Sequence, residues 1–218
     1  SMFRSLIAIL VCLPLLSCTD QKEKELSTSQ FLSQANQKLM DEAHSASLAS
    51  WIQANFITPD TTKIAAEYNA RYSKLATDLA MESKNYTGKN DDEKRMLDLM
   101  LKVLTVPSPR DEQLNKKLSN LQSELSSMYG SGKFCESPES CQSLEDLEKI
   151  IKTSRDPDQL LKAWEGWRTV SVEMKPKYIE TVELGNQGAQ ELGYPQMADL
   201  WRSNYDMPPQ DFERRLLM

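Results

Sequence analysis

The chain has 218 residues, a net charge of -6 and a pI near 5.0, with 26 basic and 32 acidic side chains. This length is enough to bury a core, either as one large domain or as two small ones. Because the basic residues are scattered among acids, the composition excludes a surface that binds nucleic acid through its phosphates.

The first residues have the pattern of an export signal. Arg4 supplies a positive charge, and the segment 6–16 that follows is mostly apolar. As a helix this segment would rise only about 16 Å, roughly half of a bilayer core, so it does not predict a membrane span. We therefore expect residues 1–17 to be a signal peptide and residues 18–26 to be a polar tether.

The sequence Leu15-Leu16-Ser17-Cys18 resembles a bacterial lipobox, in which cleavage precedes a cysteine that is then acylated. It predicts a lipid on Cys18, and hence an exported protein anchored to a membrane in the bacterial periplasm or outer envelope. The alternative is ordinary signal cleavage nearby, without a lipid.

After the tether, nearly the whole chain has the pattern of α-helix. The sequence contains only 7 glycines and no convincing run of alternating apolar residues, so no strand is predicted. No linker rich in proline, glycine or serine separates two domains. We expect an all-α fold in which residues 27–218 belong to one domain.

Two long helices are predicted first. One begins at Ser27, where Gln30 completes a capping box, and ends near Phe56, while the next begins at Pro59. Apolar spacing predicts their buried faces as Phe31, Ala35, Leu39 and Ala46 in the first helix, and Ile64, Tyr68, Tyr72, Leu75 and Leu79 in the second.

Two further helices follow. One begins at Asn90 and reaches Leu104 before Pro107 stops it. The other buries Leu114, Leu118, Leu121, Leu125 and Met128, and we expect it to end at Gly130 as a left-handed residue.

The remaining helices have recognisable first or last residues. A helix capped by Ser143 is followed by one that begins at Pro157. We expect further helices to begin at Pro176, Pro195 and Pro209, the first of them ending at Gly193. The last helix stops in mid-pattern with no C-cap, so we expect the domain to continue beyond Met218.

Cys135 and Cys141 are the cysteines that remain once the signal and Cys18 are set aside. An even pair in an exported chain predicts a disulfide, and closing so short a loop would stabilise the fold by about 2 kcal/mol. Two thiols without a nearby histidine make an incomplete zinc site, so we expect no metal here. The only histidine, His44, can complete neither a zinc triad nor a catalytic triad, and we expect it to face solvent.

The segment Ala163-Trp164-Glu165-Gly166-Trp167-Arg168 is the most informative part of the chain. Helical spacing places Trp164, Trp167 and Arg168 on one face, so indole area and a permanent cation are expected to be buried or half-buried together. Such a cation needs a carboxylate, a ring face or a bound anion as its partner. The residues alone favour a packing seam with an ordinary ion pair.

This segment belongs to a longer pattern that resembles the angiotensin-converting enzyme family of zinc peptidyl-dipeptidases. The matching segments are Thr153-Ser154-Arg155, Leu160-Leu161, Ala163 to Arg168, Lys177-Tyr178, Val182-Glu183-Leu184, Gly193-Tyr194 and Asp199 to Tyr205. The resemblance is strong over 129–206, extends more weakly to Ser27 and includes the Cys135 to Cys141 loop.

The resemblance implies the N-terminal portion of a helical domain, with lid helices above a central cleft that admits short peptides. Family members hold zinc through an H-E-x-x-H helix and a later glutamate, and none of that motif occurs in these 218 residues. The resemblance therefore places the zinc ligands beyond Met218 and predicts that this segment alone is inactive.

The family's site residues match three positions here. Arg168 and Tyr205 match residues that bind chloride ions in animal members, and Glu145 matches a glutamate that lines a substrate pocket. A guanidinium beside indole faces is a reasonable anion site, although a salt bridge to Glu165 or a distant acid is an equal alternative. Trp164, Trp167 and Trp201 are expected to be structural. The rival to the enzyme hypothesis is a non-catalytic helical envelope lipoprotein that binds a peptide or another partner.

Overall fold

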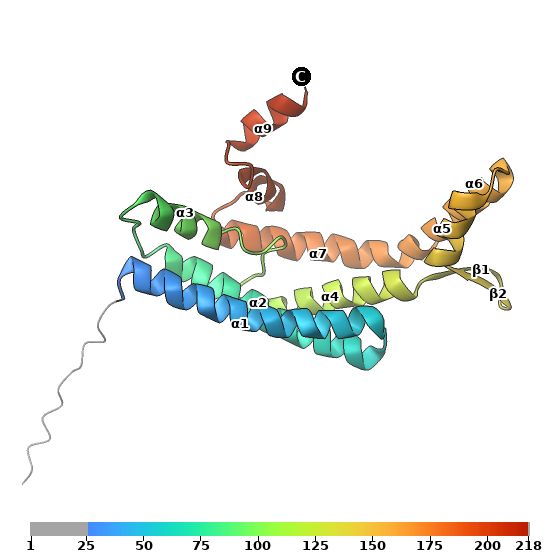
Figure 1. Cartoon of the computed structure of the whole chain (residues 1–218), viewed down its shortest axis with the longest axis horizontal. Coiled ribbons are helices and arrows are strands. Elements are labelled where there is room, and N and C mark those ends of the chain that lie inside the picture. Colours follow the sequence, from blue (N-terminus) through green and yellow to red (C-terminus); the bar gives the residue numbers. More distant parts are fainter. Residues whose placement is uncertain (1–25, 218) are drawn as a thin grey trace, which may run out of the picture.

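Figure 1 shows the structure, a computed structural model that describes residues 26–217. The predicted signal peptide, nearly all of the tether and the predicted lipidation site Cys18 lie outside the described residues. None of the helices in the described part is long and apolar enough to cross a membrane.

The described chain is helical apart from one small hairpin, which confirms the all-α prediction. In chain order its elements are α1 (Thr28–Asn55), α2 (Pro59–Ser83), α3 (Asp91–Met100), α4 (Glu112–Ser131), β1 (Lys133–Ser137), β2 (Ser140–Ser143), α5 (Leu144–Thr153), α6 (Pro157–Arg168), α7 (Val170–Leu192), α8 (Met197–Ser203) and α9 (Pro209–Leu216).

Four long helices form the body of the molecule. α2 packs against both α1 and α4, and α4 packs against α7 (Figure 1). The hairpin, α5 and α6 lie beyond one end of this body, and α8 and α9 lie near the other end of α7 (Figure 1). The two helices that carry the family-like segments, α6 and α8, therefore lie near opposite ends of α7.

The predicted helix starts are confirmed where a side chain caps the first turn. Ser27 accepts from the backbone N–H of Gln30 and the Gln30 side chain accepts from Ser27 N–H, so α1 begins with the predicted capping box. Thr58 caps α2 immediately before Pro59. Ser143 and Asp146 form a third capping box at the start of α5.

The buried face of α1 is as predicted, but that of α2 is partly wrong. Phe31, Ala35, Leu39 and Ala46 are all buried. In α2 only Leu79 of the predicted residues is fully buried; Tyr68, Tyr72 and Leu75 are half-buried, and Ile64 is 42% exposed. The buried side chains are instead mostly alanines, because α2 lies between two helices and small side chains let all three approach closely: Ala65, Ala66, Ala70, Ala76 and Ala80.

In α4 the apolar face is largely as predicted, but its end is not. Leu118, Leu121 and Leu125 are buried, whereas Leu114 and Met128 are half-buried. The helix continues through Gly130 to Ser131, so Gly130 is not a left-handed terminal residue. A Cβ at Gly130 would lie 2.5 Å from Cδ1 of Ile57, so this glycine serves the close approach of the α1–α2 turn.

Two other predicted boundaries are wrong. α3 ends at Met100, so Leu104 lies in the following loop, where it packs against the core of α1 and α2. Pro176 lies inside α7, which already begins at Val170; a proline removes one backbone donor, and here the helix continues past it.

The end of α7 is as predicted, whereas α8 begins later than predicted. Gly193 follows α7 with a φ of 102°, which confirms the predicted left-handed terminal residue. α8 begins at Met197, two residues after Pro195, while α9 begins at Pro209 as predicted.

The hairpin of β1 and β2 was not predicted. Its strands are antiparallel, and Cys135 lies opposite Cys141, with the two sulfur atoms joined as a disulfide. The strands have only five and four residues and no alternating apolar pattern, so their sequence resembles a loop. The predicted disulfide is therefore present, and the loop it closes is a hairpin.

Candidate functional site

The guanidinium of Arg168 lies over the indole of Trp164 at the end of α6. The guanidinium carbon is 3.4 Å from the ring centroid, and Nη1 donates to the backbone oxygen of Trp164 at 2.8 Å. In the described residues no carboxylate forms a salt bridge with Arg168, so the alternative of a salt bridge to Glu165 or to a distant acid is wrong there. The partner of this cation is a ring face.

The prediction that Trp164 and Arg168 are buried or half-buried together is also wrong. Trp164 is 51% exposed, and Arg168 is exposed beside it. The residues that α6 buries are the small Ala163 and Gly166, because the side chain of Phe134 from β1 packs directly against Gly166. The hairpin therefore covers the face of α6 that carries these two small residues.

Trp167 continues the aromatic surface toward α4. Its ring meets that of Tyr129 edge-on, with centroids 5.4 Å apart and planes at 85°. Beside it lies a groove of about 760 Å³, whose lining includes Trp167, Arg168, Val172 and Tyr178. This groove is mostly apolar, with Arg168 and Lys175 as its only charged lining residues.

Tyr205 lies in the turn between α8 and α9. Its ring is 59% exposed and stacks on Phe212 of α9, with centroids 4.3 Å apart. Trp201, one helical turn earlier, donates from Nε1 to the backbone oxygen of Thr105 at 2.6 Å. This bond ties α8 to the loop between α3 and α4, which agrees with the structural role expected for Trp201.

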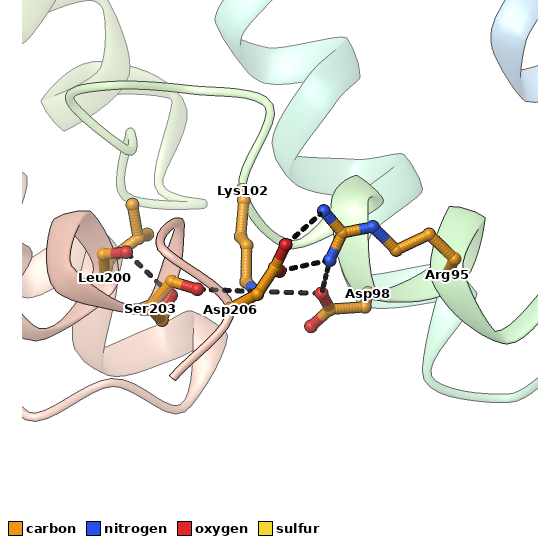
Figure 2. A network of polar contacts seen from close by, with 6 residues as sticks. All are labelled: Arg95, Asp98, Lys102, Leu200, Ser203 and Asp206. Carbon is orange, nitrogen blue, oxygen red and sulfur yellow. Dashed lines mark hydrogen bonds and ion pairs between the residues drawn. The ribbon is translucent and has the colours of Figure 1, made fainter. Parts of the chain in front are cut away.

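A polar network holds the turn after Tyr205 against α3 (Figure 2). Both terminal guanidinium nitrogens of Arg95 donate to the carboxylate of Asp206, with Nη2 to Oδ2 at 3.1 Å. Lys102 donates to Asp98 at 2.8 Å and to the backbone oxygen of Ser203 at 3.2 Å (Figure 2). Together these contacts join α3 to the residues that flank Tyr205.

The electrostatics of this network agree with its geometry. The Arg95 guanidinium, through its hydrogen bond and its charge, holds the pKa of the Asp206 carboxyl below its ordinary value of 3.8. In turn, the Asp206 carboxylate raises the pKa of Arg95. The pair is therefore ionised throughout the neutral range.

Glu145 lies in the first turn of α5, next to the disulfide hairpin. Its side chain is exposed and makes no hydrogen bond within residues 26–217. The neighbouring Asp146 is used as a helix cap, because Ser143 donates to its carboxylate and lowers its pKa. Glu145 is therefore free to contact a ligand, while Asp146 is not.

The structure does not bring the candidate residues together. Arg168 ends α6 and Tyr205 follows α8, and these helices adjoin opposite ends of α7 (Figure 1). With 23 residues, α7 spans about 34 Å at 1.5 Å per residue. Arg168 and Tyr205 therefore belong to two separate places on the molecule.

The side chains of this segment do not fit a zinc site. Residues 26–217 contain no group of three or more His, Cys, Asp or Glu side chains placed to hold one metal ion. His44 is exposed on the middle of α1, as predicted. A structural zinc site of the usual kind requires four such ligands and a catalytic one requires three.

Sequence reasoning missed the contacts between Arg95, Lys102 and the turn at Asp206. Arg95 and Asp206 are 111 positions apart, and no periodic pattern connects them. The one available signal was local, since aspartate tolerates the left-handed backbone better than most residues. Asp206 does adopt it, with a φ of 55°.

Comparisons with known proteins show the family of this chain. A family model described as angiotensin-converting enzyme, of the M2 peptidases, matches residues 22–217. The chain is 31% identical over 212 residues to angiotensin-converting enzyme of Oryctolagus cuniculus, which covers 89% of this chain and 15% of the relative.

Two further relatives show the same relation. Angiotensin-converting enzyme-like protein Ace3 of Mus musculus is 30% identical over 182 residues, which is 81% of this chain and 24% of the relative. Angiotensin-converting enzyme of Theromyzon tessulatum is 30% identical over 193 residues, which is 84% of this chain and 31% of the relative. The chain therefore spans less than a third of each of these relatives.

Proposed function

Because this chain belongs to the angiotensin-converting enzyme family, we propose that it is the N-terminal portion of a zinc-dependent peptidyl-dipeptidase that removes C-terminal dipeptides from short peptides. The observation that carries the proposal is the family match over residues 22–217. The disulfide hairpin and the capped helix α5 support it, because both fall where the resemblance predicts a disulfide loop and Glu145.

In this proposal the chain supplies walls and ligand contacts, while the zinc chemistry belongs to another part of a longer protein. Zinc, when bound there, activates the water that attacks the peptide. The donor set of residues 26–217 does not fit zinc, so no step of the reaction is assigned to a side chain here. The helices of this segment act as the lid that limits entry to small peptides.

Three side chains have proposed ligand roles. Glu145 is an exposed acid without a partner, so it can receive a basic or N–H group of a peptide. Arg168 binds chloride: only one nitrogen of its guanidinium donates to a backbone oxygen, which leaves other N–H groups for an anion. Tyr205 contributes its exposed hydroxyl to a second chloride.

The decisive experiment compares this 218-residue chain with the longer product of its reading frame. Both are assayed for dipeptide release from a blocked tripeptide, with and without a zinc chelator. We expect chelator-sensitive release by the longer protein alone. Zinc-dependent turnover by the 218-residue chain would contradict the assignment of the chemistry to another segment.

A non-catalytic peptide-binding lipoprotein is the second candidate, and one observation favours it. Apolar side chains stay exposed along the groove beside α7, where Val172 is 66% and Tyr178 61% exposed. A reading frame without any H-E-x-x-H sequence, together with a monodisperse and cooperatively melting 218-residue chain, would support the binding protein. Self-association of the isolated segment is expected if the enzyme hypothesis is correct.

The proposed location is the bacterial envelope, with a lipid on Cys18 as the anchor. Cys18→Ala should release the protein from the membrane fraction into the soluble periplasm, whereas Cys12→Ala serves as the matched control and should not. A membrane fraction unchanged by Cys18→Ala would favour another anchor, and a wild-type protein already in the soluble fraction would favour simple signal cleavage.

A further inference from the structure

A half-open cavity of about 440 Å³ lies between α1, α2 and α4, and every residue of 26–217 that lines it is uncharged. Most of the lining side chains are hydroxyls or carboxamides, among them Ser50, Gln53, Asn69, Gln122, Ser123 and Ser127. Its volume falls in the range of small-molecule sites, which runs from about 300 to 1,000 Å³. The cavity is half-open to solvent, and its neutral lining offers a charged ligand no carboxylate or cation as a partner.

Gln53 is the most buried carboxamide in this wall, with only 6% of its surface exposed. Its Nε2 donates to the backbone oxygen of Ser123 and to Oγ of Ser127, both at 2.8 Å. A backbone oxygen can only accept, so this bond fixes which end of the carboxamide carries the nitrogen. Both N–H groups of Gln53 are therefore used, and its orientation is set.

The donor and acceptor roles of the neighbouring hydroxyls, on Ser127 and Thr62, are also fixed. Thr62 donates to the backbone oxygen of Thr58 at 2.7 Å, so Ser127 must donate in its 2.6 Å contact with Thr62. Ser127 in turn accepts from Gln53. This chain of bonds joins three helices and forms the wall of the cavity before any ligand arrives.

The acceptor end of Gln53 remains open. Its Oε1 receives no hydrogen bond within residues 26–217. It is also not sealed in the core, since the one sealed side-chain atom without a hydrogen bond there is Glu42 Oε1, which pairs with Arg71. Because the rest of Gln53 is buried and the residue lines the cavity, this oxygen faces the cavity. An accessible acceptor in a preformed neutral wall is matched by an N–H or O–H donor.

We propose that this cavity binds an uncharged peptide segment of about two residues, with a backbone or side-chain N–H donating to Oε1 of Gln53. Asn69 and Gln122 supply further amide groups in the same lining. The choice of a peptide as ligand rests on the proposed function, whereas the requirement for a neutral donor comes from the lining alone.

The test uses the full-length protein and a blocked diglycine amide that carries a photoreactive diazirine. We expect cross-links to map, by mass spectrometry, to peptides that contain residues 50–57 and 122–130. A matched probe with a lysine in place of one glycine should label this cavity less at equal concentration, because the lining offers the ammonium no carboxylate.

Gln122→Glu changes the charge of the lining with almost no change of shape. The substitution should reverse the preference of the cavity for the neutral probe. The lysine probe should then label the cavity about tenfold more than it labels the wild type. Gln113→Glu is the control, because it makes the same change on an exposed position of α4 that does not line the cavity. Circular dichroism melting of both variants checks that they fold.

Three results would overturn the inference: equal labelling by both probes, labelling confined to other segments, or the same response of Gln122→Glu and Gln113→Glu. Dipeptide release by the full-length protein without labelling of the cavity would overturn this inference and leave the proposed function standing. Labelling of the cavity without dipeptide release would support this inference and overturn the proposed function.

Discussion

Arg95 on α3 and Asp206 after α8 form a two-pronged ion pair that joins positions 111 residues apart. Asp206 is also the one residue other than glycine in 26–217 with a left-handed backbone. The ion pair and the unusual backbone occur at the same residue, next to Tyr205. The contact with α3 therefore fixes the turn that presents Tyr205.

The first prediction concerns the charge of Asp206. Asp206→Asn keeps a side chain that tolerates the left-handed backbone but removes the negative charge. At pH 7 we expect a small decrease in melting temperature, on the order of a degree or two, because the pair is exposed and screened by solvent. The measurement is thermal unfolding followed by circular dichroism.

The pH dependence of this effect has a definite sign. The pKa of Asp206 is lowered by folding, so the stability from the pair is present above the unfolded pKa of about 3.9 and is lost as the pH falls through the folded pKa. The difference between wild type and Asp206→Asn should therefore shrink as the pH falls below the unfolded pKa, and it should disappear once the pH is below the lowered folded pKa. Asp78→Asn, which breaks a local pair with Lys74, controls for loss of a surface charge. A difference that stays the same over the whole acid range, from neutral pH until the protein unfolds, would show that the carboxylate charge is not its cause.

The second prediction uses Gly188, which lies on α7 against the buried turn at Pro107. A Cβ at Gly188 would lie 2.6 Å from the carbonyl carbon of Pro107 and 2.8 Å from that of Ser108. Gly188→Ala should lower the free energy of unfolding by about 1–3 kcal/mol, although alanine is favoured over glycine in a helix by about 1 kcal/mol. Chemical denaturation measures the change.

Gly193 is the control, because the constraint on it differs from the constraint on Gly188. It has open space around its missing Cβ, but its φ is 102°, so here the constraint is the backbone itself. Gly193→Ala should cost about 1 kcal/mol and Gly193→Asn clearly less, because asparagine tolerates this region. If Gly188→Ala proved neutral or stabilising, the close approach of α7 to the Pro107 turn would be wrong.

The third prediction concerns the disulfide of the hairpin. Cys135→Ser with Cys141→Ser should reduce the free energy of unfolding of the hairpin region by about 2 kcal/mol, the chain-entropy value for so short a loop. Because Phe134 packs on Gly166, amide exchange should also increase in α6. Exchange in α1 should not change, and an equal increase there would show that the disulfide stabilises the whole body of the molecule.

Much of the fold could be predicted from the sequence, because caps and helical periods act locally. Ser27, Thr58 and Ser143 each begin a helix through bonds to residues three positions away. The buried face of α2 could not be predicted in the same way. Whether Ile64 or Ala65 is buried depends on which helices pack beside α2, and that is not a local property.

The contact between Trp164 and Arg168 could be predicted from the sequence, but their exposure could not. Helical spacing placed Trp164 and Arg168 on one face, and the structure has them in contact. Their exposure could not be predicted, because Phe134 of an unpredicted hairpin covers the opposite face of α6 at Gly166. The open Oε1 of Gln53 depends on bonds to two residues of α4, about 70 positions away.

The last prediction tests Arg168 as a chloride ligand in the full-length protein. Arg168→Lys keeps the charge but loses the planar group that lies 3.4 Å above the Trp164 ring. We expect the chloride concentration that half-activates dipeptide release to rise about tenfold, because the ammonium of lysine lacks the planar fork of N–H donors that the guanidinium presents. Arg71→Lys is the matched control, since Arg71 also lies over a ring, that of Tyr68 at 5.1 Å, on a different helix. Unchanged chloride dependence in Arg168→Lys, with an unchanged melting temperature, would leave Arg168 as a structural cation on the surface of α6.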